Sequence, residues 1–330
     1  MNRRDTLVMI GALSAAGWLP ASFAQGSGKV WRVGAISAGS DVDATPLLDA
    51  FVAAMGEHGY RSGQNLILDV RYARGDPARY LPFAQELIAL KPDVLLGTGA
   101  GVALAMKGRT ATIPIVMCTV SDAVGTGLAQ SLSRPGGNVT GLSMQLHELG
   151  AKHVEIMREL LPQTRSVALF TDATQPWALS ESYERLAKTA AAAKKIAVNV
   201  HRVGGTDELR RIFRFLEVEK AEALLLNPSP RFYTLRAEII QGASALRLPS
   251  FDWAEDLVQS GGLASYGPSF IQAYRRVAYF VDRIFKGAKP ADLPIEQPTK
   301  FSLTLNRRTA AALGVKIPQS ILLRADRVIE

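Results

Sequence analysis

The chain has 330 residues, of which 48% are hydrophobic and 21% charged, and it carries a formal net charge of +8. This length exceeds what one hydrophobic core usually organises, so the composition predicts two α/β lobes and excludes a largely disordered chain. The Lys and Arg residues are spread along the sequence without a helix-turn-helix, zinc-ligand or aromatic ribonucleoprotein pattern, so the basic charge does not indicate a nucleic-acid partner.

The N-terminus has the features of a cleavable signal peptide spanning residues 1–24. Arg3 and Arg4 precede an apolar run, and small residues, Ser22 and Ala24, occupy the positions that signal peptidase reads. The run is shorter than the about 20 residues that a membrane-spanning helix needs. We therefore expect a periplasmic protein, exported by the general secretory route or, given the arginine pair, by the twin-arginine route.

The first half of the mature chain alternates short apolar runs with helical stretches. The apolar runs are typical of buried parallel strands. We expect strands at 30–36, 66–72, 94–97, 113–118 and 139–142. We expect helices at 46–58, 77–90 and 101–109. This βαβ order predicts an open, doubly wound sheet.

The same pattern restarts near His147 and predicts a second lobe of the same kind. We expect helices at 148–161, 180–194, 207–219, 232–246 and 268–285, and strands at 166–170, 197–202, 223–227 and 300–305. The chain then crosses a hinge near 143–146, 261–263 and 298–300. Lobe 1 would comprise 29–144 and 263–298, and lobe 2 would comprise 145–262 and 299–330.

Motifs that carry catalysis or bind a cofactor are incomplete. The segment Gly97–Gly101 has Val102 where a dinucleotide fingerprint needs its third glycine, and no phosphate-binding loop occurs. Ala151 replaces the second histidine of a zinc-protease helix, and no serine-hydrolase elbow occurs. We therefore expect a binding protein without catalytic residues, metal or cofactor.

Candidate ligand-binding residues follow the strands, because ligands bind at the carboxyl ends of strands in open α/β sheets. Ser, Thr and glycine N–H groups beside a helix start suit a carboxylate, and Asp suits an ammonium group. Each of these residues is also a common turn or cap residue. The candidates are Ser37, Thr98, Gly99, Ser121, Asp122, Asp172, Asn227 and Asp252.

Four aromatic residues are candidates for a flat apolar wall of the site. They are Tyr72, Trp177, Trp253 and Tyr266. Of these, Trp177 and Trp253 lie next to predicted loops, whereas aromatic residues elsewhere are more often part of a core.

Several strings resemble the ABC-transporter substrate-binding protein family, whose better-known members bind tryptophan and other aromatic amino acids. They are VSD at 120–122, RPGGNVTG at 134–141, GLASYGP at 262–268, KPADLP at 289–294, QPTKF at 297–301 and LRAD at 323–326. The resemblance implies a type I periplasmic-binding-protein clamshell, with 121–122 and the regions of Asp252 and Tyr266 facing the cleft. Ala123 and Asp172 depart from the family pattern, which often has proline and asparagine there.

The resemblance implies the solute-binding component of an ABC importer, working as a monomer with a permease and an ATPase encoded separately. The ligand would be a small organic solute, either an amino acid or an aromatic compound, captured by closure of the lobes. One alternative is a ligand-sensing module for a separate membrane receptor. Another is a secreted α/β enzyme, which would need a histidine within hydrogen-bond reach of Ser121.

Overall fold

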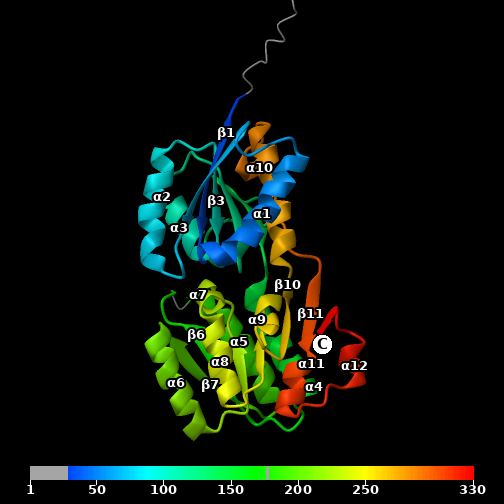
Figure 1. The fold of residues 1–330 in the computed structure, drawn as a ribbon. Coiled ribbons are helices and arrows are strands. Elements are labelled where there is room, and N and C mark those ends of the chain that lie inside the picture. Colours follow the sequence, from blue (N-terminus) through cyan, green and yellow to red (C-terminus); the bar gives the residue numbers. More distant parts are fainter. Residues whose placement is uncertain (1–28, 176–177) are drawn as a thin grey trace, which may run out of the picture.

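The computed structural model describes residues 29–175 and 178–330 and has two α/β lobes, one above the other in Figure 1. The expected signal peptide, residues 1–24, lies outside the described residues. Within the described ranges, no helix combines the length and the apolar character needed to span a membrane. The two-lobe α/β architecture predicted from the sequence is confirmed.

Lobe 1 is built on a parallel five-stranded sheet in the order β2-β1-β3-β4-β5. Strands β1, β3, β4 and β5 are largely buried because helices cover both faces, whereas the edge strand β2 is only partly buried. The strands are β1 (Trp31–Ser37), β2 (Leu66–Tyr72), β3 (Val94–Thr98), β4 (Ile115–Val120) and β5 (Val139–Ser143). The accompanying helices are α1 (Asp41–Glu57), η1 (Pro77–Arg79), α2 (Tyr80–Ala89) and α3 (Ala100–Lys107).

Helix α1 begins five residues before the predicted start at Pro46. The Ser40 side chain accepts a hydrogen bond from the Asp43 N–H, which caps the helix, and Pro46 falls inside the first turns. Pro46 is the sixth helical residue and lies beyond the N–H groups that have no intrahelical partner, so it removes one main-chain hydrogen bond from the helix. The earlier start carries Asp43 to the edge of lobe 1 that faces lobe 2.

Lobe 2 is built on a seven-stranded sheet in the order β12-β11-β10-β9-β8-β6-β7. The pairing is parallel except between β10 and β11. The strands are β6 (Ser166–Asp172), β7 (Ala197–Val203), β8 (Ala223–Leu226), β9 (Ser250–Asp252), β10 (Ala264–Pro268), β11 (Phe301–Asn306) and β12 (Arg327–Ile329). The helices are η2 (Leu146–Glu148), α4 (Leu149–Leu160), α5 (Ala178–Ala193), α6 (Thr206–Glu219), α7 (Pro230–Thr234), α8 (Arg236–Ala245), α9 (Glu255–Gln259), α11 (Arg307–Leu313) and α12 (Gln319–Leu322).

The chain crosses between the lobes after β5, after β10 and before β11. The second crossing differs from the prediction, which placed it near 261–263 and assigned 263–268 to lobe 1. Strand β10 instead pairs with β9 and β11 in the second sheet. Helix α10 (Phe270–Phe285) then packs against α1 and β4 of lobe 1, and η3 (Pro290–Asp292) follows beside β5. Strand β10 is too short to show its pairing partners in the sequence pattern.

Candidate ligand-binding cleft

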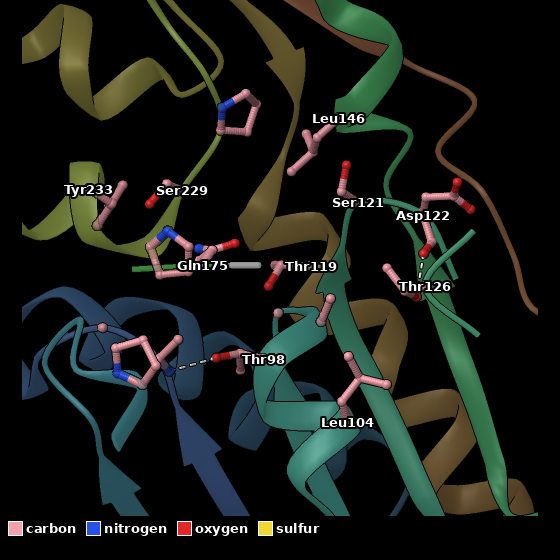
Figure 2. Close-up of a pocket in the computed structure, with 18 of the residues that line it drawn as sticks. Thr98, Leu104, Thr119, Ser121, Asp122, Thr126, Leu146, Gln175, Ser229 and Tyr233 are labelled. Atoms are coloured by element: carbon pink, nitrogen blue, oxygen red, sulfur yellow. Dashed lines mark hydrogen bonds between the residues drawn. The ribbon is translucent and has the colours of Figure 1, made fainter. Parts of the chain in front are cut away.

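A cavity of about 700 Å³ lies between the lobes. Lobe 1 contributes the loops that follow β1, β3 and β4, and lobe 2 contributes the loops that follow β6, β8 and β9. Figure 2 shows Ser229 and Tyr233 of lobe 2 on the opposite side of this cavity from Thr98 of lobe 1. The loops that follow the strands of both lobes, which the strand-end rule selected as candidates, therefore line this cavity.

The lobe 1 wall is formed by hydroxyl groups and a helix start. Four of the candidate residues line the cavity: Ser37, Thr98, Gly99 and Ser121. The Thr98 hydroxyl accepts a hydrogen bond from the Ala38 N–H at 2.9 Å, which fixes the loop after β1 (Figure 2). Gly99 has φ 84° and precedes α3 without a side-chain cap, so the first N–H groups of that helix remain available at the cavity edge.

Thr119, which belongs to the same strand-end loop as Ser121, also lines the cavity. Its φ is 55°, in the left-handed region that β-branched residues rarely adopt, and the register of β4 with β5 shifts between Met117 and Val120. Such strain is held only where the surrounding structure imposes it, and it is concentrated at functional sites. Gln175, which comes from lobe 2, lines the same cavity (Figure 2).

Aromatic and aliphatic side chains form the rest of the lining. The aromatic members are Tyr80, Tyr233, Trp253, Phe270 and Tyr274. Burial raises the pKa of Tyr80 to about 12, so its hydroxyl stays protonated at neutral pH. Of the aromatic residues expected from the sequence, Trp253 lines the cavity, Tyr72 and Tyr266 do not, and Trp177 lies outside the described residues.

Trp253 is held in place by the strand beside it. It is 3% exposed, and a Cβ added to Gly267 of β10 would lie 2.0 Å from the Trp253 carbonyl oxygen. Only glycine permits this close approach of the two backbones. The GLASYGP string therefore contributes to the site indirectly, by allowing Trp253 to reach the cavity.

Asp172 does not line the cavity and its charge is compensated. Its carboxylate accepts hydrogen bonds from the Thr174 and Ser229 hydroxyls at 2.6 Å each, and Arg231 lies 3.5 Å away. These partners organise the loops after β6 and β8. Asp172, predicted as a ligand-binding residue, therefore has a structural role in lobe 2 and adds no uncompensated charge to the cavity.

Three further candidates lie outside the cavity lining: Asn227, Asp252 and Tyr266. Asn227 is buried and donates to the Ser180 carbonyl oxygen at 3.3 Å. Asp252 is completely buried, and desolvation raises the pKa of its carboxyl well above the usual value. The Tyr266 ring stacks on Phe301 instead. Each residue stands near a strand end, but its side chain turns into lobe 2.

Asp122 lines the cavity but is engaged by its own loop. One carboxylate oxygen accepts hydrogen bonds from the Val124 and Gly125 N–H groups at 3.1 and 2.9 Å. His147 Nε2 lies 3.8 Å from the other oxygen. In Figure 2 the Asp122 carboxylate points away from the middle of the cavity. Asp122 therefore acts as a turn residue at the rim.

His147 is the histidine that the sequence did not place near Ser121. Its Nδ1 lies 3.1 Å from the main-chain carbonyl oxygen of Ser121, and its Nε2 lies 3.6 Å from Glu148. This contact joins the imidazole to a carbonyl oxygen, whereas activation of a nucleophile requires the serine hydroxyl. No His/Cys/Asp/Glu group able to hold a metal ion occurs in 29–175 or 178–330.

Two other acidic residues line the cavity, and their environments differ. Asp43 forms an ion pair with Arg236 of lobe 2 at 2.6 Å. Glu181, in the first turn of α5, is exposed at the cavity with Ser182 and Arg185 of the same helix. Neither acid could be assigned from sequence, because helix α1 starts earlier than expected and Glu181 follows no strand.

Comparison with known proteins shows which proteins this chain resembles in sequence and in fold. The chain is 23% identical to a tyrosine-binding protein of Clostridioides difficile (strain R20291) over 277 residues, which cover 81% of this chain and 76% of that protein. A conserved domain protein of Vibrio cholerae is 27% identical with a TM-score of 0.84, covering 91% of this chain and 100% of that structure. An ABC domain from Streptococcus pneumonia in complex with L-Trp is 23% identical, with a TM-score of 0.84 and coverage of 91% and 99%.

The fold is that of type I periplasmic binding proteins, as expected. The family model described as ABC transporter substrate binding protein matches residues 43–329, which include both sheets apart from β1. The chain therefore belongs to the ABC transporter substrate-binding protein family.

Proposed function

We propose that this chain is the periplasmic solute-capturing component of an ABC importer and that its lobes close around an aromatic amino acid. It would deliver the solute to a separately encoded permease and ATPase, acting as a monomer. The observation that carries this proposal is the interlobe cavity of about 700 Å³ with aromatic residues from both lobes. Its volume and mainly apolar lining suit a small organic ligand fixed by a few polar groups.

The polar groups are arranged for a zwitterion. The hydroxyls of Ser37 and Thr98 and the first N–H groups of α3 suit the ligand carboxylate, since a helix N-terminus carries partial positive charge. For the ammonium group we propose Glu181 of lobe 2, because Asp43 and Asp122 already have partners. A ligand held this way would touch both lobes and favour the closed arrangement.

The names of two relatives support this ligand class. One is a tyrosine-binding protein and another was solved with L-Trp. The enzyme alternative has weaker support, because the His147 imidazole is bonded to the Ser121 carbonyl oxygen and not to its hydroxyl. A sensing role for a separate receptor would use the same cleft, so a ligand test addresses both binding functions.

The test is thermal unfolding of the mature chain, from Gln25 onward, against amino acids, aromatic acids, nucleosides and sugars. A ligand at 100 times its Kd should raise the melting temperature by roughly 5 °C, since binding to the folded state alone stabilises a protein of this size. The compound should be recovered unchanged. No shift with any aromatic amino acid would contradict the proposed ligand class, and conversion of the compound would favour the enzyme.

Glu181→Gln tests the ammonium contact separately. We expect the Kd for L-tryptophan to rise about tenfold, because a charge-assisted hydrogen bond is lost. The Kd for indole-3-propionate, which has no ammonium group, should stay the same. Equal effects on the two ligands would remove Glu181 from the ammonium site. The matched control is Glu155→Gln on the exposed surface of helix α4, which should leave the Kd for both ligands unchanged.

A further inference from the structure

An ion pair spans the cleft beside the cavity. Asp43 belongs to the first turn of α1 in lobe 1, and Arg236 is the first residue of α8 in lobe 2. The Arg236 guanidinium lies 2.6 Å from the Asp43 carboxylate. The Asp43 side chain is 6% exposed and that of Arg236 is 26% exposed, so closure of the lobes removes most water from the pair.

Each lobe holds its own member of the pair in position. In lobe 1 the Ser40 hydroxyl donates to Asp43 at 2.6 Å. In lobe 2 the guanidinium donates to the Tyr233 carbonyl oxygen at 2.8 Å and lies 4.9 Å from the centre of the Tyr233 ring. The Tyr233 hydroxyl in turn donates to Asp256. Because both groups are oriented within their lobes, little side-chain entropy is lost when the pair forms.

The loops of lobe 1 and helix α7 of lobe 2 are in contact beside the ion pair. A Cβ added to Gly75, after β2, would lie 3.4 Å from the Arg231 Cα, and one added to Gly99 would lie 3.8 Å from Pro230. Helix α7 therefore sits against the strand-end loops of lobe 1, as its place between the lobes in Figure 1 shows. The Asp43–Arg236 pair lies next to this contact.

We propose that Asp43 and Arg236 form a latch that stabilises the closed arrangement whether or not a ligand is bound. This inference rests on the proposed lobe closure. When the lobes open, both groups return to water, so the pair contributes to the closed state alone and slows escape of the solute. The latch also neutralises Asp43, which lines the cavity, so the bound solute does not meet a free carboxylate there.

The double variant Asp43→Asn/Arg236→Met tests the latch, because it removes both charges and leaves neither one unpaired. In stopped-flow measurements with L-tryptophan we expect the dissociation rate to rise about tenfold, with the association rate nearly unchanged. Each single variant should raise the dissociation rate at least as much as the double variant does, because the effects of two directly interacting residues are not additive. The control is Asp41→Asn/Arg74→Met, an exposed ion pair within lobe 1, which should leave both rates unchanged.

The latch can also be measured without ligand. Spin labels at Gln85→Cys on α2 and Arg214→Cys on α6 report the opening, because these helices lie on the same side of opposite lobes in Figure 1. The native Cys118 is completely buried, and burial raises the pKa of its thiol, so it should escape labelling. We expect a larger short-distance population in the wild type than in the double variant.

The outcomes separate the latch from the proposed ligand. In one outcome, the wild type binds no aromatic amino acid while the double variant shows longer distances between the spin labels without ligand. That result would refute the proposed ligand class and support the latch. If the double variant matches the wild type in the distance distribution and in the dissociation rate, the latch is refuted. Circular dichroism of each variant establishes that it is folded.

Discussion

His153 connects three elements of lobe 2 and should make that lobe sensitive to acid. Its Nδ1 lies 2.7 Å from the Tyr183 hydroxyl of α5, and its Nε2 lies 2.8 Å from the Tyr266 carbonyl oxygen of β10. The side chain is 1% exposed, and desolvation lowers its pKa from 6.5 to about 4. The folded lobe therefore holds this imidazole neutral, whereas the unfolded chain protonates it below pH 6.5.

The sign and size of the effect follow from these two pKa values. Between pH 6.5 and pH 4 the unfolded state binds more protons at this site, so the stability contributed by neutral His153 is present above pH 6.5 and is lost as the pH falls. The loss between pH 7 and pH 4 amounts to about 3 kcal/mol. Buried Asp252 has the opposite sign, because its raised pKa favours the folded state at low pH.

Since the two groups oppose each other in the wild type, the test compares the wild type with His153→Gln. Glutamine keeps a donor and an acceptor but does not titrate. We expect the free energy of unfolding, measured by urea titration with circular dichroism, to differ little at pH 7. Between pH 7 and pH 4 the free energy of unfolding of the variant should fall by about 3 kcal/mol less than that of the wild type. Parallel curves for the two proteins from pH 7 to pH 4 would refute this reasoning.

Three substitutions probe the cavity wall and its support. Trp253→Ala should raise the Kd for an aromatic amino acid at least about tenfold, because an aromatic wall is lost; an unchanged Kd by calorimetry would exclude Trp253 from the site. Asp252→Asn should leave that Kd unchanged and raise the melting temperature at pH 7, since no buried carboxyl then has to ionise or stay protonated. Lost binding with an intact fold would return Asp252 to the ligand site. Gly267→Ala should cost about 3 kcal/mol of stability and weaken binding together, because its methyl group would meet the Trp253 carbonyl oxygen; wild-type stability would contradict that close approach.

The periodic parts of the fold were predictable, and the short parts were not. Strands such as Val94–Thr98 appear as apolar runs, and the prediction of a strand at 94–97 agrees with the structure to within one residue. Strands β9, β10 and β12 have three to five residues and carry no distinct pattern, so their places in the second sheet depend on tertiary contacts. The position of the second hinge crossing was wrong for that reason.

The strand-end rule located the cleft but did not determine where each side chain points. It found Ser37, Thr98 and Ser121, whose small side chains stay at the sheet edge. It also selected Asp172 and Asp252, whose carboxyl groups turn into lobe 2. The Asp172 carboxylate accepts a hydrogen bond from the Ser229 hydroxyl, and the Asp252 carboxyl is completely buried. The aromatic lining comes from helices and loops of both lobes, and its members come together only through the tertiary fold.

The central claim, capture of an aromatic solute between the lobes, is tested most directly by a crystal structure of the mature chain with L-tryptophan. We expect density for one ligand in the interlobe cavity, with its carboxylate at the start of α3, its ammonium group near Glu181 and its ring beside Trp253. Ligand density outside this cavity, or an empty cavity at saturating L-tryptophan, would contradict the account.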